Sequence, residues 1–377
     1  MFCRETKKII MRQQLYGTKL SINLTYLKNN FNFLKSINQK LRIIAMVKAN
    51  AYGHGDILIT KQLEELGVDY FGVADFEEGI RLRQNQINSR IMIMNPSINN
   101  LTEIIKYNLE PVVYSMDIFY ALIKCIKKEK IKNNIHFHVK INTGMNRWGF
   151  DVEELVTLMS QIKINSQLIL TSVYSHLASS DTPIHDNFTN LQVNKLISAH
   201  EILTNELGGF YPLHIFNSNG ILRHLESSDK FTFCRLGMLL YGGINHPKLS
   251  PISELSSTVL QVREVGKNES IGYYRKFVTK RKIKIAVIPF GYADGLQRSW
   301  GNGVLKFFYK GHLLPTVGHI SMDSCIVDVS MVDNISVGDE IFFFCNERPV
   351  WDLARELNSI SYEILSTLSK RIKRVVY

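Results

Sequence analysis

Eight short apolar runs alternate with helix-patterned stretches over the first two thirds of the sequence. The apolar runs span residues 42–47, 70–74, 91–94, 111–114, 135–141, 168–174, 213–216 and 231–234. The helix-patterned stretches span residues 24–34, 57–66, 76–82, 101–107, 116–126, 152–162 and 188–207. This alternation predicts βαβ units and a parallel sheet, and eight repeats in about 230 residues match the size of a (β/α)8 barrel. A doubly wound open sheet is the alternative, but no glycine-rich dinucleotide motif follows the first run.

The pattern changes after about residue 255, where β-like runs follow one another with turn residues between them. They span residues 258–265, 283–288, 313–317, 325–329 and 340–344, and only residues 350–368 are again typical of helix. The predicted fold class is therefore α/β plus β, an N-terminal TIM-like (β/α)8 barrel followed by a C-terminal β-rich domain. The predicted domains are an unpatterned lead at 1–14, the barrel at 15–252 and the β domain at 253–377.

Composition narrows the class of protein but does not define it. The 377 residues carry a net charge of +11, yet the basic residues are scattered, and no nucleic-acid-binding motif accompanies them. No apolar stretch reaches the roughly 18 residues of a membrane-spanning helix. The five cysteines are widely spaced and form no CxxC motif, which favours a reducing, cytoplasmic compartment over a disulfide framework. The start of the chain lacks the apolar core of a signal peptide, and Met11 is an alternative start.

Polar and glycine-rich residues fall where the predicted barrel strands end. They are Lys48, the segment 144–149, His176, Asn217, Ser218 and Arg235. Barrel enzymes build their sites from the carboxyl ends of the strands, so we expect these residues to converge on one rim. Arg235 is expected to end the eighth strand.

The segment 46–55, MVKANAYGHG, places Lys48 at a strand end with Tyr52 close by. Desolvation lowers the pKa of a lysine, and a neutral amine can form a Schiff base or act as a base. Taken alone, each residue has a plainer interpretation. A strand-end lysine can extend to solvent, Arg235 can be a surface ion-pair residue, and His176 can be a satisfied core histidine.

At this motif the sequence resembles the alanine racemase family, and further motifs follow in the same order. They are KINTGMNRWG at 140–149, GYADG at 291–295, GHISMD at 318–323, SYEI at 361–364 and the closing RIKRVVY. The resemblance extends from about residue 15 to the C-terminus. The family fold is a barrel followed by a β domain, which agrees with the pattern above.

The resemblance implies pyridoxal 5′-phosphate as the cofactor, carried on Lys48. It implies that Arg235 faces the pyridine nitrogen of the cofactor and that hydroxyls and backbone amides hold the phosphate. The implied cofactor-binding residues are Lys48, Tyr52, His176, Asn217, Ser218, Arg235, Gly237, Met238 and Tyr362.

The resemblance also implies a two-base reaction, with Lys48 on one face of the substrate carbanion and Tyr292 on the other. Tyr292 is tuned through His176 and Arg235, because a tyrosine with a pKa of about 10 is otherwise a weak base near neutrality. Arg147 and the backbone of Met322 contact the substrate carboxylate. Lys140 corresponds to a lysine that is often carbamylated to position that arginine.

The implied function is interconversion of L-alanine and D-alanine, supplying D-alanine for peptidoglycan. The family also implies a homodimer whose subunits share the active sites, with no nucleic-acid or membrane partner. Racemisation of another small amino acid such as serine stays open. A non-catalytic cofactor-binding protein is a second alternative, and a decarboxylase of basic amino acids, with a carboxylate in place of Arg235, is a third.

Three positions depart from the family pattern. Asn142 replaces an aspartate, Leu236 replaces a proline, and His319 replaces an arginine near the substrate entrance. His136 and His138 alternate on one predicted strand. A metal pair there is disfavoured because no third ligand has suitable spacing, and we predict no metal site.

Overall fold

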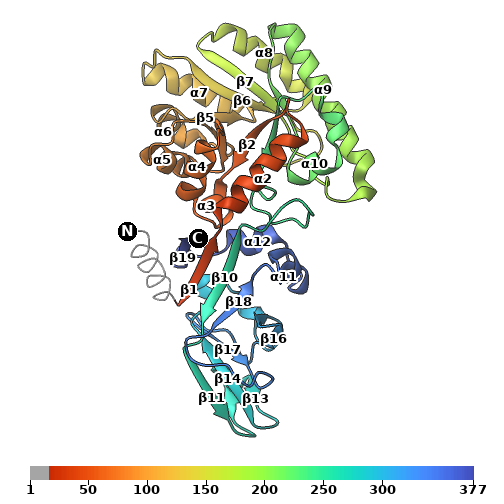
Figure 1. The fold of residues 1–377 in the computed structure, drawn as a ribbon. Coiled ribbons are helices and arrows are strands. Elements are labelled where there is room, and N and C mark those ends of the chain that lie inside the picture. Colours follow the sequence, from red (N-terminus) through yellow and green to blue (C-terminus); the bar gives the residue numbers. More distant parts are fainter. Residues whose placement is uncertain (1–16) are drawn as a thin grey trace, which may run out of the picture. The chain divides into compact units, whose positions relative to one another are not determined.

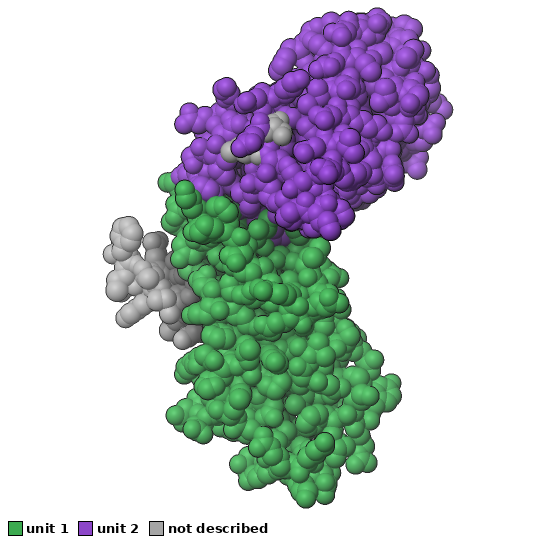
Figure 2. Space-filling view, turned by 90° about the vertical axis from the view of Figure 1, so that its right-hand side faces the viewer, with its two compact units in different colours: residues 1–30, 53–55, 241–377 green, residues 31–52, 56–240 purple. Residues whose placement is uncertain are grey.

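The structure, a computed structural model, describes residues 17–377. These residues divide into two compact units, which Figure 2 colours separately. One unit comprises residues 31–52 and 56–240. The other comprises residues 17–30, 53–55 and 241–377. The lead at 1–14 and the alternative start at Met11 lie outside the described residues, and the domain boundary at residue 252 stays a prediction.

Eight parallel strands of the first unit close into a barrel, as the alternating pattern predicts. The strands are β2 (Arg42–Met46), β3 (Tyr70–Val73), β4 (Arg90–Ile93), β5 (Glu110–Val113), β6 (Ile135–Lys140), β7 (Leu168–Tyr174), β8 (Leu213–His214) and β9 (Phe233–Leu236). The first and last strands close the ring by pairing Ile43 with Cys234 and Ala45 with Leu236. Strands covered on both faces are expected to be apolar throughout, which explains the continuous apolar runs in the sequence.

Helices follow the barrel strands and lie outside the ring (Figure 1). The helices associated with this part of the chain are α2 (Leu24–Ile37), α3 (Lys48–Tyr52), α4 (Asp56–Glu65), α5 (Phe76–Gln84), α6 (Leu101–Lys106), α7 (Met116–Lys128), α8 (Leu155–Ile164), α9 (Asp186–Leu207) and α10 (Ser218–Arg223). Helix α5 begins at a capping box, in which Asp75 accepts from the backbone of Glu77 and Glu78 accepts from Asp75. Such a box satisfies backbone donors that the first turn leaves unpaired.

The second unit is built on a six-stranded sheet that joins both ends of the described chain. In spatial order its strands are β16 (His312–Pro315), β15 (Lys306–Tyr309), β18 (Glu340–Phe344), β10 (Ser253–Thr258), β1 (Thr18–Ile22) and β19 (Lys373–Val376). A three-stranded sheet contains β11 (Gln261–Val265), β14 (Ile283–Ile288) and β17 (Cys325–Asp328), and a hairpin pairs β12 (Ser270–Ile271) with β13 (Phe277–Val278). Helices α11 (Val350–Glu356) and α12 (Ser361–Ser366) follow. The predicted β-rich C-terminal part is thus confirmed.

Several expected boundaries are wrong, each for a local reason. The run at 258–265 is two strands, because β10 ends at Thr258 and joins one sheet while β11 begins at Gln261 in another. The run at 213–216 pairs only as β8, since the chain then turns into the cap of α10. Arg235 does not end the eighth strand: β9 continues through Leu236, which pairs with Ala45.

No helix within residues 17–377 is long and apolar enough to cross a membrane. Cys125, Cys234, Cys325 and Cys345 are buried free thiols. Burial of the Cys234 thiol raises its pKa to about 12, so this cysteine is a packing residue at neutral pH.

Candidate active site

Lys48 lies where β2 passes into a strained turn at the carboxyl end of the barrel strands. Residues 49–52 all have φ near +50°, so four consecutive non-glycine residues adopt the left-handed conformation. That conformation costs roughly 1–2 kcal/mol per residue, and specific contacts hold it. Ala49 N donates to Glu78 Oε1 at 2.6 Å, and Asp56 N donates to Asn50 Oδ1 at 3.2 Å. Backbone strain maintained in this way is typical of functional sites.

The environment of Lys48 disfavours its charged form. Burial lowers the pKa of this amine, and the positive charges of Arg147 and Arg235 lower it further, while Glu78 opposes them. A larger fraction of the amine is therefore neutral near pH 7 than in an exposed lysine. A neutral amine is the form that attacks a carbonyl or accepts a proton.

Tyr52 and Ser218 each contact the backbone segment that follows β9. An ideal Cβ on Gly237 would lie only 2.7 Å from both Cζ and Oη of Tyr52, so the phenol packs directly on this glycine. Leu239 N lies 3.4 Å from Ser218 Oγ. Asn217 caps α10 by accepting from Gly220 N at 2.9 Å, which fixes Ser218 at the helix start. Hydroxyls and backbone N–H groups of this kind bind anions without a large fixed charge.

Arg235 is the most buried cation of the site, with 3 % of its surface exposed. Its Nη1 donates to His214 Nδ1 at 2.7 Å, and its Nη2 donates to Ser175 O at 2.7 Å and to His176 Nδ1 at 3.0 Å. The guanidinium carbon lies 4.9 Å from the centre of the Tyr174 ring. Burial lowers the pKa of Arg235 to about 10, which still leaves it charged at neutrality. Its Nε–H makes no hydrogen bond with any residue in 17–377.

Arg235 fixes the tautomers of the two histidines that it contacts. A guanidinium only donates, so Nδ1 of both His176 and His214 must accept. Burial, followed by the charge of Arg235, lowers the pKa of both rings well below the ordinary value, so both are neutral. Each ring therefore carries its proton on Nε2.

His214 and Tyr174 also belong to this site, although no sequence motif indicates them. His214 stands inside an apolar run and stacks on Tyr174 with ring centres 4.8 Å apart. A polar residue inside an otherwise apolar strand is the signal that could have found it, because such a group must have a buried partner.

Lys140 ends β6 and is buried beside the loop that carries Arg147. Its Nζ lies 5.4 Å from the centre of the Trp148 ring and 5.7 Å from that of Tyr174. Burial and the charges of Arg147, Arg235 and Lys48 lower its pKa to about 7. The Arg147 guanidinium stacks on Trp148 at 5.0 Å and is exposed.

Asn142 organises the loop between Lys140 and Arg147. Its Oδ1 accepts from Gly144 N at 3.2 Å and from Asn146 N at 3.1 Å. Its Nδ2 donates to Asp151 Oδ1 at 3.0 Å and to Asn146 Oδ1 at 3.1 Å. An amide suits this position because it both accepts and donates, whereas a carboxylate would only accept.

The second unit brings Tyr292 and Met322 together. Tyr292 N donates to Ser321 O at 3.0 Å and Ala293 N donates to Met322 O at 3.0 Å. Asp294 closes the tyrosine turn by accepting from Gly291 N at 2.9 Å. The side chains of Tyr292 and Met322 are 42 % and 54 % exposed, so both are available on the surface of their unit.

Two further sequence-predicted positions lie in this unit. Tyr362 stands in α12 and is half-buried, and Gly53 packs against the same helix, since an ideal Cβ would be 2.1 Å from Leu365 O. His319 faces Tyr274 with ring centres 6.4 Å apart. The structure thus groups Lys48, Tyr52, Lys140, His176, Ser218 and Arg235 in the barrel unit, and Tyr292, Met322 and Tyr362 in the other.

The fold and these groups define a barrel enzyme with a cationic site at the carboxyl ends of its strands and a separate β-rich unit. Residues 22–245 match the family described as alanine racemase, N-terminal domain, and residues 252–376 match alanine racemase, C-terminal domain. The chain therefore belongs to the alanine racemase family.

Individual relatives agree over nearly the whole length. The chain is 34 % identical to alanine racemase 1 of Caldanaerobacter subterraneus, with 96 % of this chain and 95 % of the relative covered. Among solved structures, alanine racemase of Clostridium difficile 630 has a TM-score of 0.87 at 31 % identity, with 96 % of each chain covered. The Bartonella henselae enzyme, solved with covalently bound pyridoxal phosphate, has a TM-score of 0.84 at 29 % identity, covering 96 % of this chain and 99 % of that one.

Proposed function

We propose that this protein is a pyridoxal-phosphate-dependent alanine racemase that interconverts L-alanine and D-alanine. The observation that carries the proposal is Arg235, a buried and permanently charged residue whose Nε–H bonds no residue in 17–377. With its guanidinium at the ring nitrogen of the cofactor, Arg235 would keep that nitrogen from holding a proton. This would limit electron withdrawal and favour simple proton exchange over transamination.

The residues of the barrel unit fit the cofactor. Tyr52, Ser218 and the backbone at Gly237 and Met238 would hold the phosphate, because the Tyr52 phenol packs on Gly237 and the Ser218 hydroxyl lies at the amide of Leu239. Lys48 would hold the cofactor covalently through Nζ, helped by its lowered pKa. When bound, the cofactor withdraws electrons from the amino acid and acidifies its α-hydrogen.

Lys48 also serves as the base on one face of the substrate. With substrate bound, its Nζ would be a desolvated amine near the positive charges of Arg147 and Arg235. Both effects favour the neutral amine, so Nζ can take a proton from the α-carbon and return it.

Tyr292 is the base on the opposite face. Because His176 accepts from Arg235 through Nδ1, its remaining proton lies on Nε2 and is available for donation to the phenolic oxygen. A hydrogen bond of this kind stabilises the phenolate form of a tyrosine. Tyr292 then takes a proton as Lys48 delivers one, and the configuration inverts.

Arg147 and the backbone of Met322 orient the substrate carboxylate. A carbamate on Lys140 would place a negative charge beside Arg147 and fix its guanidinium. The low pKa of Lys140 supports this modification, because only a neutral amine reacts with carbon dioxide.

Tyr292 and Met322 would come from a second copy of the chain, so that a homodimer has two shared sites. This proposal is supported by the exposure of both side chains on the β-rich unit. Mixing inactive Lys48→Ala protein with inactive Tyr292→Phe protein should restore activity, since a mixed dimer has one intact site. With random reassociation about a quarter of the sites recover. If each site is built from a single chain, the mixture stays inactive.

The biological role follows from the reaction. D-alanine is a building block of peptidoglycan, and we place this activity in the cytoplasm, where the four buried free thiols are stable.

Polarimetry of the cofactor-loaded protein tests the function. Starting from either enantiomer of alanine, the optical rotation should decay to zero at comparable rates, because the equilibrium constant is one. Lys48→Ala should abolish both the decay and the visible absorbance of the bound cofactor. A loaded protein that leaves the rotation of L-alanine unchanged would refute the assignment, and faster decay with L-serine would favour a serine racemase.

A further inference from the structure

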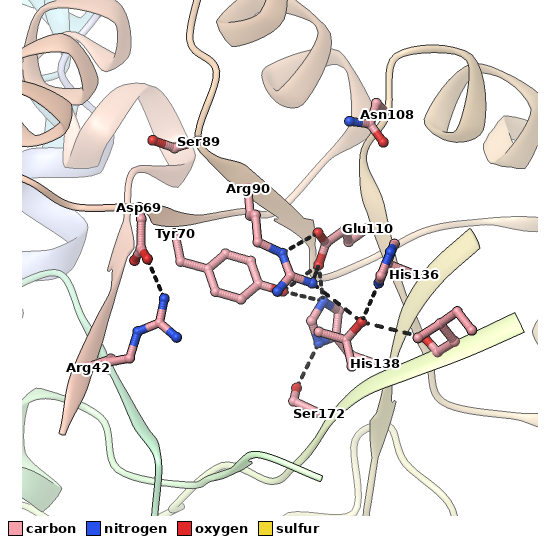
Figure 3. A network of polar contacts seen from close by, with 12 residues as sticks. Arg42, Asp69, Tyr70, Ser89, Arg90, Asn108, Glu110, His136, His138 and Ser172 are labelled. Atoms are coloured by element: carbon pink, nitrogen blue, oxygen red, sulfur yellow. Dashed lines mark hydrogen bonds and ion pairs between the residues drawn. The ribbon is translucent and has the colours of Figure 1, made fainter. Parts of the chain in front are cut away.

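A polar network joins residues of β3, β4, β5 and β6 near the amino ends of these strands (Figure 3). Lys48 follows the opposite, carboxyl end of β2. Arg90 and Glu110 are the first residues of β4 and β5. Glu110 accepts from Arg90 Nε at 2.7 Å and Nη2 at 2.9 Å, and from the hydroxyl of Tyr70. His138 of β6 places Nε2 3.0 Å from Glu110 Oε2. The proposed reaction uses none of these residues.

Glu110 is ionised in this network. Burial alone would raise its pKa, but the hydrogen bonds and charges of His138 and Arg90 lower it to about 2. Burial lowers the pKa of His138 in turn, so this ring is neutral despite its carboxylate neighbour. His138 Nε2 also lies 2.7 Å from Tyr70 Oη, whose proton goes to Glu110. Because an ionised carboxylate only accepts, His138 must donate from Nε2 and present Nδ1 as an acceptor.

Hydrogen bonds continue from His138 through the barrel interior to Arg235. His138 Nδ1 lies 2.7 Å from Ser172 Oγ, Ser172 Oγ lies 2.8 Å from His214 Nε2, and His214 Nδ1 lies 2.7 Å from Arg235 Nη1. A shift in register makes this path, because β6 and β7 pair Phe137 with Leu170 but His138 with Ser172. The extra residue, Thr171, is a bulge that brings the serine opposite the histidine.

Both ends of this path impose the same direction on its protons. Arg235 requires a lone pair on His214 Nδ1, so the His214 proton lies on Nε2 and points at Ser172. Glu110 requires a proton on His138 Nε2, so His138 Nδ1 accepts. A hydroxyl is the group that can accept from one ring and donate to the other. Every hydrogen bond between Arg235 and Glu110 therefore points toward the carboxylate.

Arg235 has no carboxylate partner of its own within residues 17–377. A buried cation without a counter-charge is costly, and hydrogen bonds aligned in a chain polarise one another. We propose that Glu110, His138 and Ser172 are positioning residues for Arg235. Their one-directional hydrogen-bond chain transmits the negative charge of Glu110 to His214 Nδ1 and holds the guanidinium in one orientation.

This inference rests on the proposed function only through the part that Arg235 takes in it. A guanidinium held in one orientation keeps its Nε–H without an acceptor among residues 17–377, whereas a loosened one can turn Nε–H toward other acceptors. Loss of the hydrogen-bond chain should therefore lower kcat more than it weakens the binding of substrate. Other polar groups at this end of the barrel pair with one another: Arg42 pairs with Asp69, and His136 bonds Thr171 at 3.2 Å.

Nitrogen-15 NMR of the histidine rings in the cofactor-loaded protein tests the chain without a mutation. His138 and His214 should both be neutral at pH 7 with the proton on Nε2. An imidazolium at either position, or a proton on Nδ1, would overturn the proposal. This readout does not depend on racemase activity. It therefore distinguishes a wrong racemase assignment from a wrong proposal for the hydrogen-bond chain.

Ser172→Ala removes the middle link, and Thr171→Val is its matched control. Thr171 loses a hydroxyl from the same bulge, but it contacts Arg90 at 3.4 Å and His136, not His138 or His214. Loss of buried hydrogen bonds between neutral groups predicts a fall in kcat of up to about tenfold for Ser172→Ala. The KM for alanine should stay within about twofold, and the absorption band of the cofactor should shift.

The control should keep kcat and the ring resonances of both histidines. Equal losses in the two variants, or unchanged kcat and absorption in Ser172→Ala, would overturn the positioning role. If Ser172→Ala does not fold, Glu110→Gln tests the far end. Its amide can donate to His138 Nε2, so His138 should lose its single tautomer, and a ring that keeps its proton on Nε2 would refute the coupling.

Discussion

Lys140 should exist as a carbamate in the native protein, and replacing it should disable Arg147. Its pKa of about 7 leaves roughly half of the amine neutral at pH 7. An ordinary lysine with a pKa of about 10.4 is neutral in roughly one molecule in 2,500. Burial thus increases the reactive fraction about a thousandfold, and the product is an anion surrounded by cations that repel the free ammonium.

Two results should separate a carbamate from a free amine. Protein equilibrated with ¹³C-bicarbonate should give a carbonyl resonance that disappears in Lys140→Met. The same variant should lose about 10- to 100-fold in kcat/KM for alanine, from the loss of one charge-assisted bond that holds Arg147. Lys163→Met, which removes an exposed lysine bonded to Glu206, should change neither.

Stability gives an independent check on the same residue. If Lys140 were a free amine, the unfolded chain would bind its proton between pH 7 and 10.5 while the folded chain would not. The free energy of unfolding would then rise over that range, by up to roughly 5 kcal/mol. No carbonyl resonance, an unchanged kcat/KM in Lys140→Met and this rise with pH would together refute the carbamate.

Two further variants test the proposed phosphate-binding residues and the loop that carries Arg147. Gly237→Ala places a Cβ 2.7 Å from the Tyr52 phenol, so the dissociation constant of pyridoxal phosphate should rise about tenfold, as overpacking by 1–3 kcal/mol predicts. Equilibrium titration measures this dissociation constant, with Gly266→Ala as a control. Equal affinities of the two variants for pyridoxal phosphate would contradict a phosphate site at Gly237 and Tyr52. Asn142→Asp replaces a donor to Asp151 by a second carboxylate and should lower the free energy of unfolding by about 1–2 kcal/mol. Denaturant unfolding should show that the double variant Asn142→Asp/Asp151→Asn recovers the lost free energy of unfolding. An unchanged free energy of unfolding in Asn142→Asp alone would contradict a stabilising role for this contact.

The sequence predicts the barrel well because its strands are buried on both faces and are therefore continuously apolar. It predicts the second unit less completely. Strands β1 and β19 pair with each other from opposite ends of the chain, and no local pattern shows such a pairing. Strand β15 was also missed, since KFFY beside two glycine-containing turns has no clear alternation.

The candidate site divides in the same way. Sequence motifs predict Lys48, Lys140 and Arg235 as site residues, because their neighbours in sequence are unusual. The sequence does not indicate the hydrogen-bond chain from Glu110 to His214, because each of its residues stands alone among apolar residues. Only the bulge at Thr171 aligns them. His138 was noted only as half of a disfavoured metal pair, whereas the structure gives it Tyr70, Glu110 and Ser172 as partners.

The central claim is that Lys48 and Tyr292 exchange protons on opposite faces of alanine. Exchange of the α-hydrogen in deuterium oxide, followed by proton NMR with chiral analysis, tests it most directly. The native protein should wash out the α-hydrogen of both enantiomers and racemise them. Tyr292→Phe should wash it out of one enantiomer with retained configuration and racemise neither at an appreciable rate. Wash-out from both enantiomers with native racemisation in Tyr292→Phe would contradict the account.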